Sequence, residues 1–301
     1  MVTGELFSVN IGSCSELHYV DTGMFDTAEY GAVYLLTGER IAIIDTGIGK
    51  RPELILDALD TLGYQPADVD VIAPTHVHLD HAGGAGQLAK ACPNATVYVH
   101  ELGARHLIDP ERLIAGTKAA VGDQWEYYGD IVPVPEDRVE ECADGDVIDL
   151  GDHELRVHHM PGHAPHQVIF EDPANDAVFT ADAAGIYVPG LDRVRETSPP
   201  PDFDLERCLE DIERIGELDP EVLCYAHFGP ARTADRLSAY ETVLSEWVGS
   251  VRRRRSRLGN DAAVIASFVE ELSIDEQWGK AKAVGETKMN VRGVFQYLDD
   301  T

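Results

Sequence analysis

Positive charge is scarce in this sequence. Its 301 residues include 24 lysines and arginines against 54 aspartates and glutamates, which gives a formal net charge of −30. Lysine is found only at positions 50, 90, 118, 280, 282 and 288. A surface this acidic repels nucleic acids and anionic membranes, so we expect neither as a partner.

The shortage of basic residues also predicts a salt-adapted protein. Molar salt shortens the Debye length to about 3 Å, which screens the mutual repulsion of the carboxylates. A high-salt cytoplasm therefore favours an acidic, lysine-poor chain. The alternative is an acidic protein from an ordinary cytoplasm.

Long apolar runs are missing as well. No apolar stretch approaches the length of about 18 residues that a membrane-spanning helix needs. The first residues, MVTGELFSVNIG, have no basic region ahead of an apolar stretch, so we expect no signal peptide. The sequence therefore predicts a cytoplasmic protein without a transmembrane helix.

Cysteine pairs with the spacing of a metal or redox motif are absent too. The cysteines are odd in number and never form CxxC; they are Cys14, Cys92, Cys142, Cys208 and Cys224. We expect them to be reduced and to behave as small apolar residues. None has the neighbouring histidine and cationic setting that would lower its pKa, so a cysteine nucleophile is not expected.

The chain has enough apolar residues, 44%, to bury the core of one large domain with a helical appendage. β-Branched and aromatic runs between glycine-containing turns predict strands at 6–11, 17–20, 32–36, 40–45, 69–73, 96–100, 155–159, 167–171, 177–181 and 222–226. Apolar residues at helical spacing predict helices at 52–62, 82–91, 205–218, 233–258, 260–273 and 284–298. Two such halves suggest two packed sheets with helices outside.

Two segments stand apart from this rhythm. Residues 101–135 are mostly helical and carry Trp125, Tyr127 and Tyr128, which suits either a lid or substrate wall or a packed surface excursion. The run Arg252 to Arg255, followed by Arg257, is interpreted as a solvated helix face paired to the acidic body rather than as a nucleic-acid patch. We place the main domain at 1–232, with 101–135 as an insertion, and a C-terminal helical extension at 233–301.

The segment that carries chemistry is THVHLDH, which follows the apolar strand VDVIAP and precedes the glycine-rich AGGAG. It places His76, His78, Asp80 and His81 within six residues. Buried without a cation, these groups would repel one another or remain unsatisfied. A metal ion resolves that conflict, so the segment predicts a metal site.

THVHLDHAGG resembles the HxHxDH signature of the metallo-β-lactamase superfamily, and the likeness extends over residues 30–230. The resemblance implies an α/β fold, a four-layer αββα sandwich. It also implies two divalent ions, with zinc as the default and iron or manganese tolerated. One ion would take His76, His78 and His163 of MPGH; the other would take Asp80, His81 and His227 of LCYAHFG; Asp182 of AVFTAD would bridge them.

Four further residues are candidates for supporting roles. Asp45 in IAIIDTGIG resembles the family's aspartate that supports the metal-binding loop, with an Asx-turn cap as the alternative. Tyr187 would donate to a developing oxyanion, as a tyrosine does in related lactonases, or would serve only in packing. His166 and His100 either line the pocket or cap turns.

The resemblance implies a hydrolase in which a dinuclear-metal-bound hydroxide attacks an ester, thioester or lactone of a small molecule, with Asp80 orienting the nucleophile. The pattern is similar to the glyoxalase II-like and lactonase-like branches. In the former, basic groups of C-terminal helices hold glutathione, and Arg252 to Arg255 lie in a comparable region. The alternatives are a phosphodiesterase or RNA-processing nuclease, a mononuclear-iron persulfide dioxygenase and a metal-stabilised scaffold; a homo-oligomer also stays open.

Overall fold

A computed structural model describes residues 3–272 and 274–301 of the chain. Its strand β3 (Ala32–Thr37) shows how the sequence builds a layered protein. Side chains of a strand alternate between its two faces. Val33 and Leu35 pack with the helices outside the sheet, whereas Tyr34 and Leu36 pack toward a second sheet. The Tyr34 ring meets the ring of Phe179 from that second sheet, with centroids 5.3 Å apart. Both faces of β3 are therefore buried.

The first sheet has seven strands in sequential order, antiparallel from β1 to β4 and parallel from β4 to β7. Its strands are β1 (Leu6–Ser8), β2 (Leu17–Asp21), β3, β4 (Ile41–Ile44), β5 (Val69–Ala73), β6 (Thr96–His100) and β7 (Val139–Cys142). The carboxyl ends of β4 and β5 lie side by side, so the loops that follow them meet at one edge.

The second sheet has six strands in the order β15-β14-β11-β10-β9-β8, and only β11 and β14 run parallel among its pairs. Its strands are β8 (Val147–Asp149), β9 (Glu154–His159), β10 (Val168–Asp172), β11 (Ala177–Ala181), β14 (Val222–Tyr225) and β15 (Gly229–Arg232). A separate hairpin is formed by β12 (Ile186–Val188) and β13 (Arg193–Arg195).

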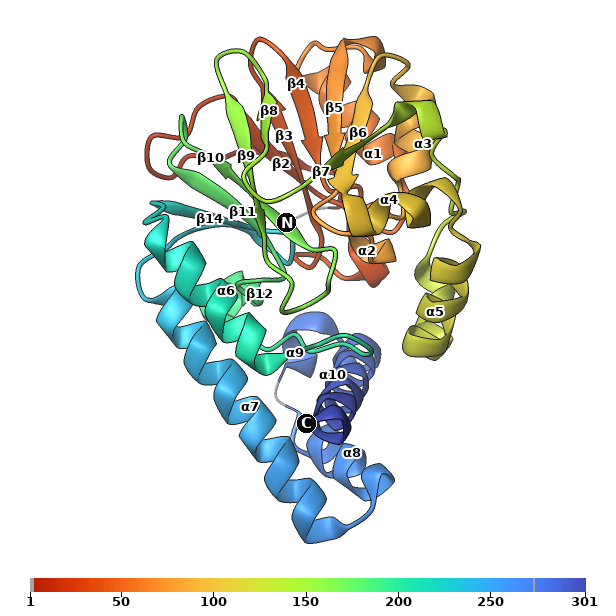
Figure 1. Cartoon of the computed structure of the whole chain (residues 1–301), viewed down its shortest axis with the longest axis vertical. Coiled ribbons are helices and arrows are strands. Elements are labelled where there is room, and N and C mark those ends of the chain that lie inside the picture. The colour runs from red at the N-terminus through yellow and green to blue at the C-terminus, as the bar shows by residue number, and fades with distance from the viewer. Residues whose placement is uncertain (1–2, 273) are drawn as a thin grey trace.

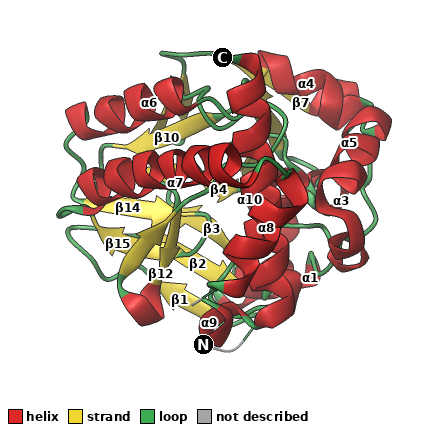
Figure 2. Ribbon diagram, turned by 90° about the horizontal axis from the view of Figure 1, so that it is seen from below, coloured by secondary structure: helices red, strands yellow, loops and turns green. Residues whose placement is uncertain are grey.

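Helices cover the outer faces of both sheets (Figures 1 and 2). The first sheet carries α1 (Glu53–Thr61), α2 (Leu79–Ala82), α3 (Ala85–Ala91), α4 (Glu101–Ile108) and α5 (Glu111–Val121) on its side of the molecule. The second sheet carries α6 (Leu205–Glu217) and α7 (Arg236–Leu258), and the chain ends with α8 (Asp261–Glu270), α9 (Asp275–Trp278) and α10 (Lys280–Asp300). Short 3₁₀ helices are η1 (Met24–Asp26), η2 (Pro66–Asp68), η3 (Gly122–Tyr127), η4 (Glu136–Arg138) and η5 (Pro189–Leu191).

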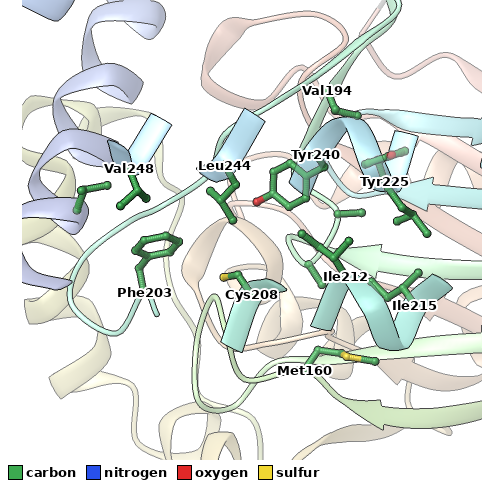
Figure 3. Packing of buried hydrophobic residues seen from close by; sticks show 14 of the residues in the cluster. Met160, Val194, Phe203, Cys208, Ile212, Ile215, Tyr225, Tyr240, Leu244 and Val248 are labelled. Atoms are coloured by element: carbon green, nitrogen blue, oxygen red, sulfur yellow. The ribbon is translucent and has the colours of Figure 1, made fainter. Parts of the chain in front are cut away.

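The core has one apolar layer between the sheets and one under each set of helices. Figure 3 shows the layer beneath α6 and α7, where Ile212 and Ile215 of α6 lie opposite Tyr240 and Leu244 of α7. The alternating residues of β10, β11 and β14 divide between this layer and the one between the sheets. The predicted four-layer αββα sandwich with C-terminal helices is thereby confirmed.

Several elements differ from the prediction. The helix expected over 82–91 is broken between α2 and α3 at Gly83 and Gly84, where the backbone passes directly against residues 46–48. A Cβ on Gly83 would lie 2.3 Å from the Leu79 carbonyl oxygen, and one on Gly84 would lie 2.5 Å from the Thr46 carbonyl oxygen. The short strands β7, β8, β12, β13 and β15 were not expected.

The C-terminal region also differs in detail. The last predicted helix begins earlier, at Lys280, and α9 precedes it. The helix expected over 260–273 ends at Glu270, and its predicted last residue lies outside the described residues. Within the described residues, no helix is long and apolar enough to cross a membrane.

The arginine run of α7 forms its ion pairs with the other C-terminal helices. Arg254 pairs with Glu271, and Arg255 pairs with Asp261 and Asp299 at 2.9 and 2.7 Å. The expected pairing is therefore seen for Arg254 and Arg255, but their partners lie in the C-terminal region rather than in the strand-rich body.

Candidate metal centre

The loop after β5 presents four of the candidate ligands. His76 lies in this loop, His78 is the N-cap residue of α2, and Asp80 and His81 lie within that single helical turn. The N–H groups of His81 and Ala82 both donate to the His78 carbonyl, which fixes the turn. The sequence HxHxDH therefore wraps its side chains around one point.

The other three candidates come from loops at the ends of second-sheet strands. His163 lies in the loop between β9 and β10, Asp182 directly follows β11, and His227 follows β14. The φ angle of Ala181 is +48°, a strained value for a residue with a side chain, at the point where the chain turns to present Asp182. The edges of the two sheets thus converge on the loop after β5.

The structure brings all seven side chains together as two histidine-rich groups. Ligand atoms of His76, His78 and His163 lie within 4.8 Å of one another, and so do those of Asp80, His81 and His227. These groups are the two sets that the sequence resemblance implied.

Asp182 lies between the two groups. Its Oδ2 is 3.0 Å from His163 Nε2 and 3.6 Å from His81 Nε2, and its Oδ1 is 3.6 Å from His227 Nε2. One carboxylate therefore faces both groups, as the predicted bridging ligand would.

Burial and mutual repulsion favour the neutral form of two of the imidazoles, whereas Asp45 and Asp182 overcome burial and raise the pKa of His81 well above its ordinary value. Burial, helped by the neighbouring histidines, holds the pKa of His76 well below its ordinary value. Burial likewise lowers the pKa of His163 to about 3, although Asp182 opposes the shift. Neutral imidazoles keep a lone pair free, which is the form that binds a cation.

The carboxylates have the opposite tendency. Burial favours the neutral acid, but His163, His81 and His227 overcome it and hold the pKa of Asp182 below its ordinary value. His81, His227 and His78 do the same for Asp80. Both carboxylates are therefore held ionised among the imidazoles.

Polar atoms without partners test whether this centre fits a metal. Among the described residues, His76 Nε2, His81 Nε2 and Asp182 Oδ1 are buried and accept or donate no hydrogen bond. A buried polar atom without a partner costs about 1–3 kcal/mol. His163 Nε2 also lies only 3.1 Å from His78 Nδ1, close enough to share a cation. The donor set of imidazoles and carboxylates suits divalent zinc, iron or manganese.

Comparison with known proteins fits this geometry. The sequence profile of the Metallo-beta-lactamase superfamily matches residues 26–227, which include every candidate ligand. The chain belongs to the metallo-beta-lactamase superfamily. A metallo-beta-lactamase fold-containing protein of Sulfurisphaera tokodaii is 31% identical over 72% of this chain and 79% of its own length.

One further relative and one solved structure show how far the likeness extends. An acyl-coenzyme A thioesterase of Bos taurus is 27% identical, but the match covers only 55% of this chain and 62% of the thioesterase. The crystal structure of ST1585, the archaeal protein of the 31% match, superposes with a TM-score of 0.70 at 24% identity, covering 94% of this chain and 99% of that one. This structural match shows the fold.

Residues outside the ligand set form hydrogen bonds that orient two of the candidate histidine ligands, His81 and His227. Asp45 Oδ1 accepts from the Thr75 N–H and hydroxyl, each at 2.8 Å, and its Oδ2 lies 2.9 Å from His81 Nδ1. His227 Nδ1 donates to the Tyr30 carbonyl at 2.9 Å. The support expected from Asp45 is present; the Tyr30 carbonyl has no side-chain signature and was not foreseen.

The three weaker candidates lie around this centre in different ways. The Tyr187 hydroxyl donates to Asp192 at 2.9 Å, so its role as an oxyanion donor stays a prediction. The His166 ring is 5.5 Å from that of His78, and burial lowers its pKa to about 2. His100 caps α4, because its Nδ1 accepts from the Leu102 N–H at 3.2 Å.

Proposed function

We propose that this chain is a metal-dependent hydrolase that cleaves a thioester, ester or lactone of a small molecule with two divalent ions, zinc being the ion we expect. The observation that carries the proposal is the convergence of seven side chains with unpartnered nitrogen and oxygen atoms facing one another. Ions held by these histidines and aspartates would lower the pKa of a water toward about 7 and would polarise a substrate carbonyl.

The chain's own residues account for the remaining steps. Asp80 is the most open of the carboxylates, with 25% of its side chain exposed, and its Oδ2 lies 3.7 Å from His227 Nε2. Held ionised by its histidine neighbours, Asp80 can orient the attacking water and carry a proton to the leaving group. His78 is also partly exposed, so the substrate carbonyl approaches on the side of His78 and Asp80.

Among the substrate classes, we favour a thioester. The support is the name of the mammalian relatives, which are acyl-coenzyme A thioesterases. The glutathione-holding role considered for Arg252 to Arg255 loses support, because Arg254 and Arg255 are occupied by carboxylates of the extension.

The decisive test is His78→Ala, with metal content and turnover measured together. We expect about two ions per wild-type chain, thioester hydrolysis by the wild type, and no turnover by the variant with an unchanged circular dichroism spectrum. His158→Ala is the matched control, because His158 pairs with Glu171 at 2.8 Å outside the centre. Unchanged turnover in His78→Ala contradicts the proposal.

A panel of substrates separates the alternatives. Thioesters, lactones, a β-lactam, phosphodiesters and structured RNA are offered to the same preparation. Cleavage of phosphodiesters or RNA alone would favour the nuclease alternative. One iron per chain with oxygen consumption would favour the persulfide dioxygenase.

A further inference from the structure

A cavity of about 580 Å³ lies between the segment α5–η3 and the start of α10. Its size is that of pockets for small organic ligands, which span about 300–1,000 Å³. Phe25, Tyr127 and Trp278 form its aromatic part. One face of α10 forms the opposite wall, with residues at helical spacing: Ala281, Val284, Gly285, Lys288 and Arg292.

The lining of this cavity reverses the charge balance of the chain. Basic residues outnumber acidic ones there, whereas the whole chain has 24 basic against 54 acidic residues. The basic members are Lys280, Lys282, Lys288 and Arg292, and the acidic members are Asp26, Asp123 and Glu126. Asp26 itself lies 3.7 Å from Arg51, so part of its charge is already compensated.

The distribution of lysines makes the reversal sharper. Lys50 lies over the ring of Tyr127, 5.3 Å from its centroid, and Lys118 lies 4.7 Å from the centroid of Trp125 next to the cavity wall. With the three lysines of the lining, five of the chain's six lysines are gathered in this region. Only Lys90 lies outside this region, so the lysines of the chain cluster around the cavity.

Three of the lining cations are available to a ligand. Lys282 is buried and occupied, since its Nζ is 2.7 Å from Glu286 Oε2. Lys280, Lys288 and Arg292 are exposed, and in the described part of the chain no carboxylate forms an ion pair with them. Gly279 precedes α10 without a side-chain cap, so the N–H groups at the start of this helix add to the positive field.

The cavity is joined to the metal centre through Tyr30. The Tyr30 ring is 5.2 Å from that of Trp278, which lines the cavity, and 4.9 Å from that of His227. On the other wall, α5 contacts α2, the turn that carries Asp80. A ligand in the cavity therefore lies one layer of aromatic side chains away from the metal centre.

We infer that this cavity binds a nucleoside diphosphate group, carried by the thiol part of the substrate. The inference rests on the proposed thioester hydrolysis. Lys280, Lys288 and Arg292 would hold the phosphates, and the partly exposed ring of Tyr127 would offer the aromatic surface against which a base packs, backed by the buried rings of Phe25 and Trp278. The acyl end of the same molecule would then extend past Tyr30 to the open side of the metal centre.

Binding is tested first, without turnover. ADP is titrated calorimetrically into the zinc-loaded full chain, with adenosine as the uncharged probe. We expect K280Q/K288Q/R292Q to raise the ADP dissociation constant about 10- to 100-fold, and added salt to weaken binding to the wild type. R252Q/R253Q/R257Q removes the same charge from exposed positions of α7 outside the lining and should leave ADP binding unchanged. Equal ADP affinity in the wild type and K280Q/K288Q/R292Q overturns the inference.

Turnover then decides whether the nucleotide is part of the substrate. Butanoyl-coenzyme A is compared with the butanoyl thioester of N-acetylcysteamine, which lacks the nucleotide. We expect K280Q/K288Q/R292Q to raise KM about tenfold for the first ester only, with kcat unchanged for both. If ADP instead alters the hydrolysis of the small ester, the cavity serves a free nucleotide and the substrate assignment fails. If neither ester is hydrolysed, the proposed function is contradicted. The ADP titration still tests ligand binding in the cavity independently.

Discussion

Asp211 of α6 accepts a hydrogen bond at 2.7 Å from the backbone N–H of Gly162, a residue 49 positions earlier in the chain. Gly162 precedes His163, and a Cβ on it would lie 2.4 Å from the Cys208 nitrogen. The turn that presents His163 therefore lies directly on α6 and is held by a buried carboxyl group. Burial raises the pKa of Asp211 to about 7, although the Gly162 N–H opposes the shift.

This pKa predicts a pH dependence of folding stability. Because the folded-state pKa lies above the unfolded value, the stabilisation is fully present below pH about 4 and is lost as the pH rises through about 7. Asp211→Asn keeps an acceptor for Gly162 but cannot ionise. We expect the difference in Tm, Asp211→Asn minus wild type, to increase by a few degrees from pH 5 to pH 8, because only the wild type loses stability as Asp211 ionises. Glu217→Gln, an exposed change at the end of α6, is the control, and parallel curves for Asp211→Asn and the wild type would contradict the prediction.

Removal of Asp45 is expected to weaken metal binding without removing a ligand. Asp45 fixes the Thr75 backbone and the His81 ring together, so Asp45→Ala frees both. Loss of such a supporting carboxylate costs about 10- to 100-fold in metal affinity. Competition with a chromogenic chelator measures this effect. Asp57→Ala, an exposed change in α1, should leave zinc affinity unchanged; an equal loss in both variants would mean that Asp45 has no special role.

Tyr187 offers a test of the oxyanion assignment. Its hydroxyl donates to Asp192 and accepts from Arg236 at 3.4 Å, so it must give up Asp192 to reach a substrate. We expect Tyr187→Phe to lower kcat by less than about tenfold. Loss of a true oxyanion donor costs about 10²- to 10³-fold, so a fall of that size would support the catalytic role instead.

The net charge of −30 predicts that salt stabilises the fold. Screening of carboxylate repulsion should raise the Tm by several degrees as KCl increases from low to molar concentration. The Debye length is already about 3 Å at 1 M, so the rise should level off near that concentration. A Tm that does not change with KCl, or falls, would argue against adaptation to high salt.

The elements most visible in the sequence were those with a complete local pattern. The strands β5, β6 and β11 match their predicted bounds, because each is a continuous apolar or β-branched run between turn residues. The hairpin β12–β13 was missed, since three-residue strands are too short to show a period. The break between α2 and α3 depends on the approach of residues 46–48, which no local pattern reveals.

The candidate site divides in the same way. The spacing of His76, His78, Asp80 and His81 alone predicts a metal site. His163, Asp182 and His227 were identified only through the order of motifs in a known family. The support from Asp211 and from the Tyr30 carbonyl was invisible, because each is a contact between residues far apart in the chain. The cavity beside α10 was not predicted, although three of the six lysines lie close together in the sequence, at positions 280, 282 and 288.

Tyr30 is held at both ends. Its hydroxyl donates to Glu286 of α10 at 2.9 Å, and its carbonyl accepts from His227. One residue thus connects the last helix to the second group of ligands through two hydrogen bonds. A displacement of α10 that shifts Glu286 would therefore act on the hydrogen bond that orients the His227 imidazole, so we expect changes in the C-terminal helices to affect the second group of ligands.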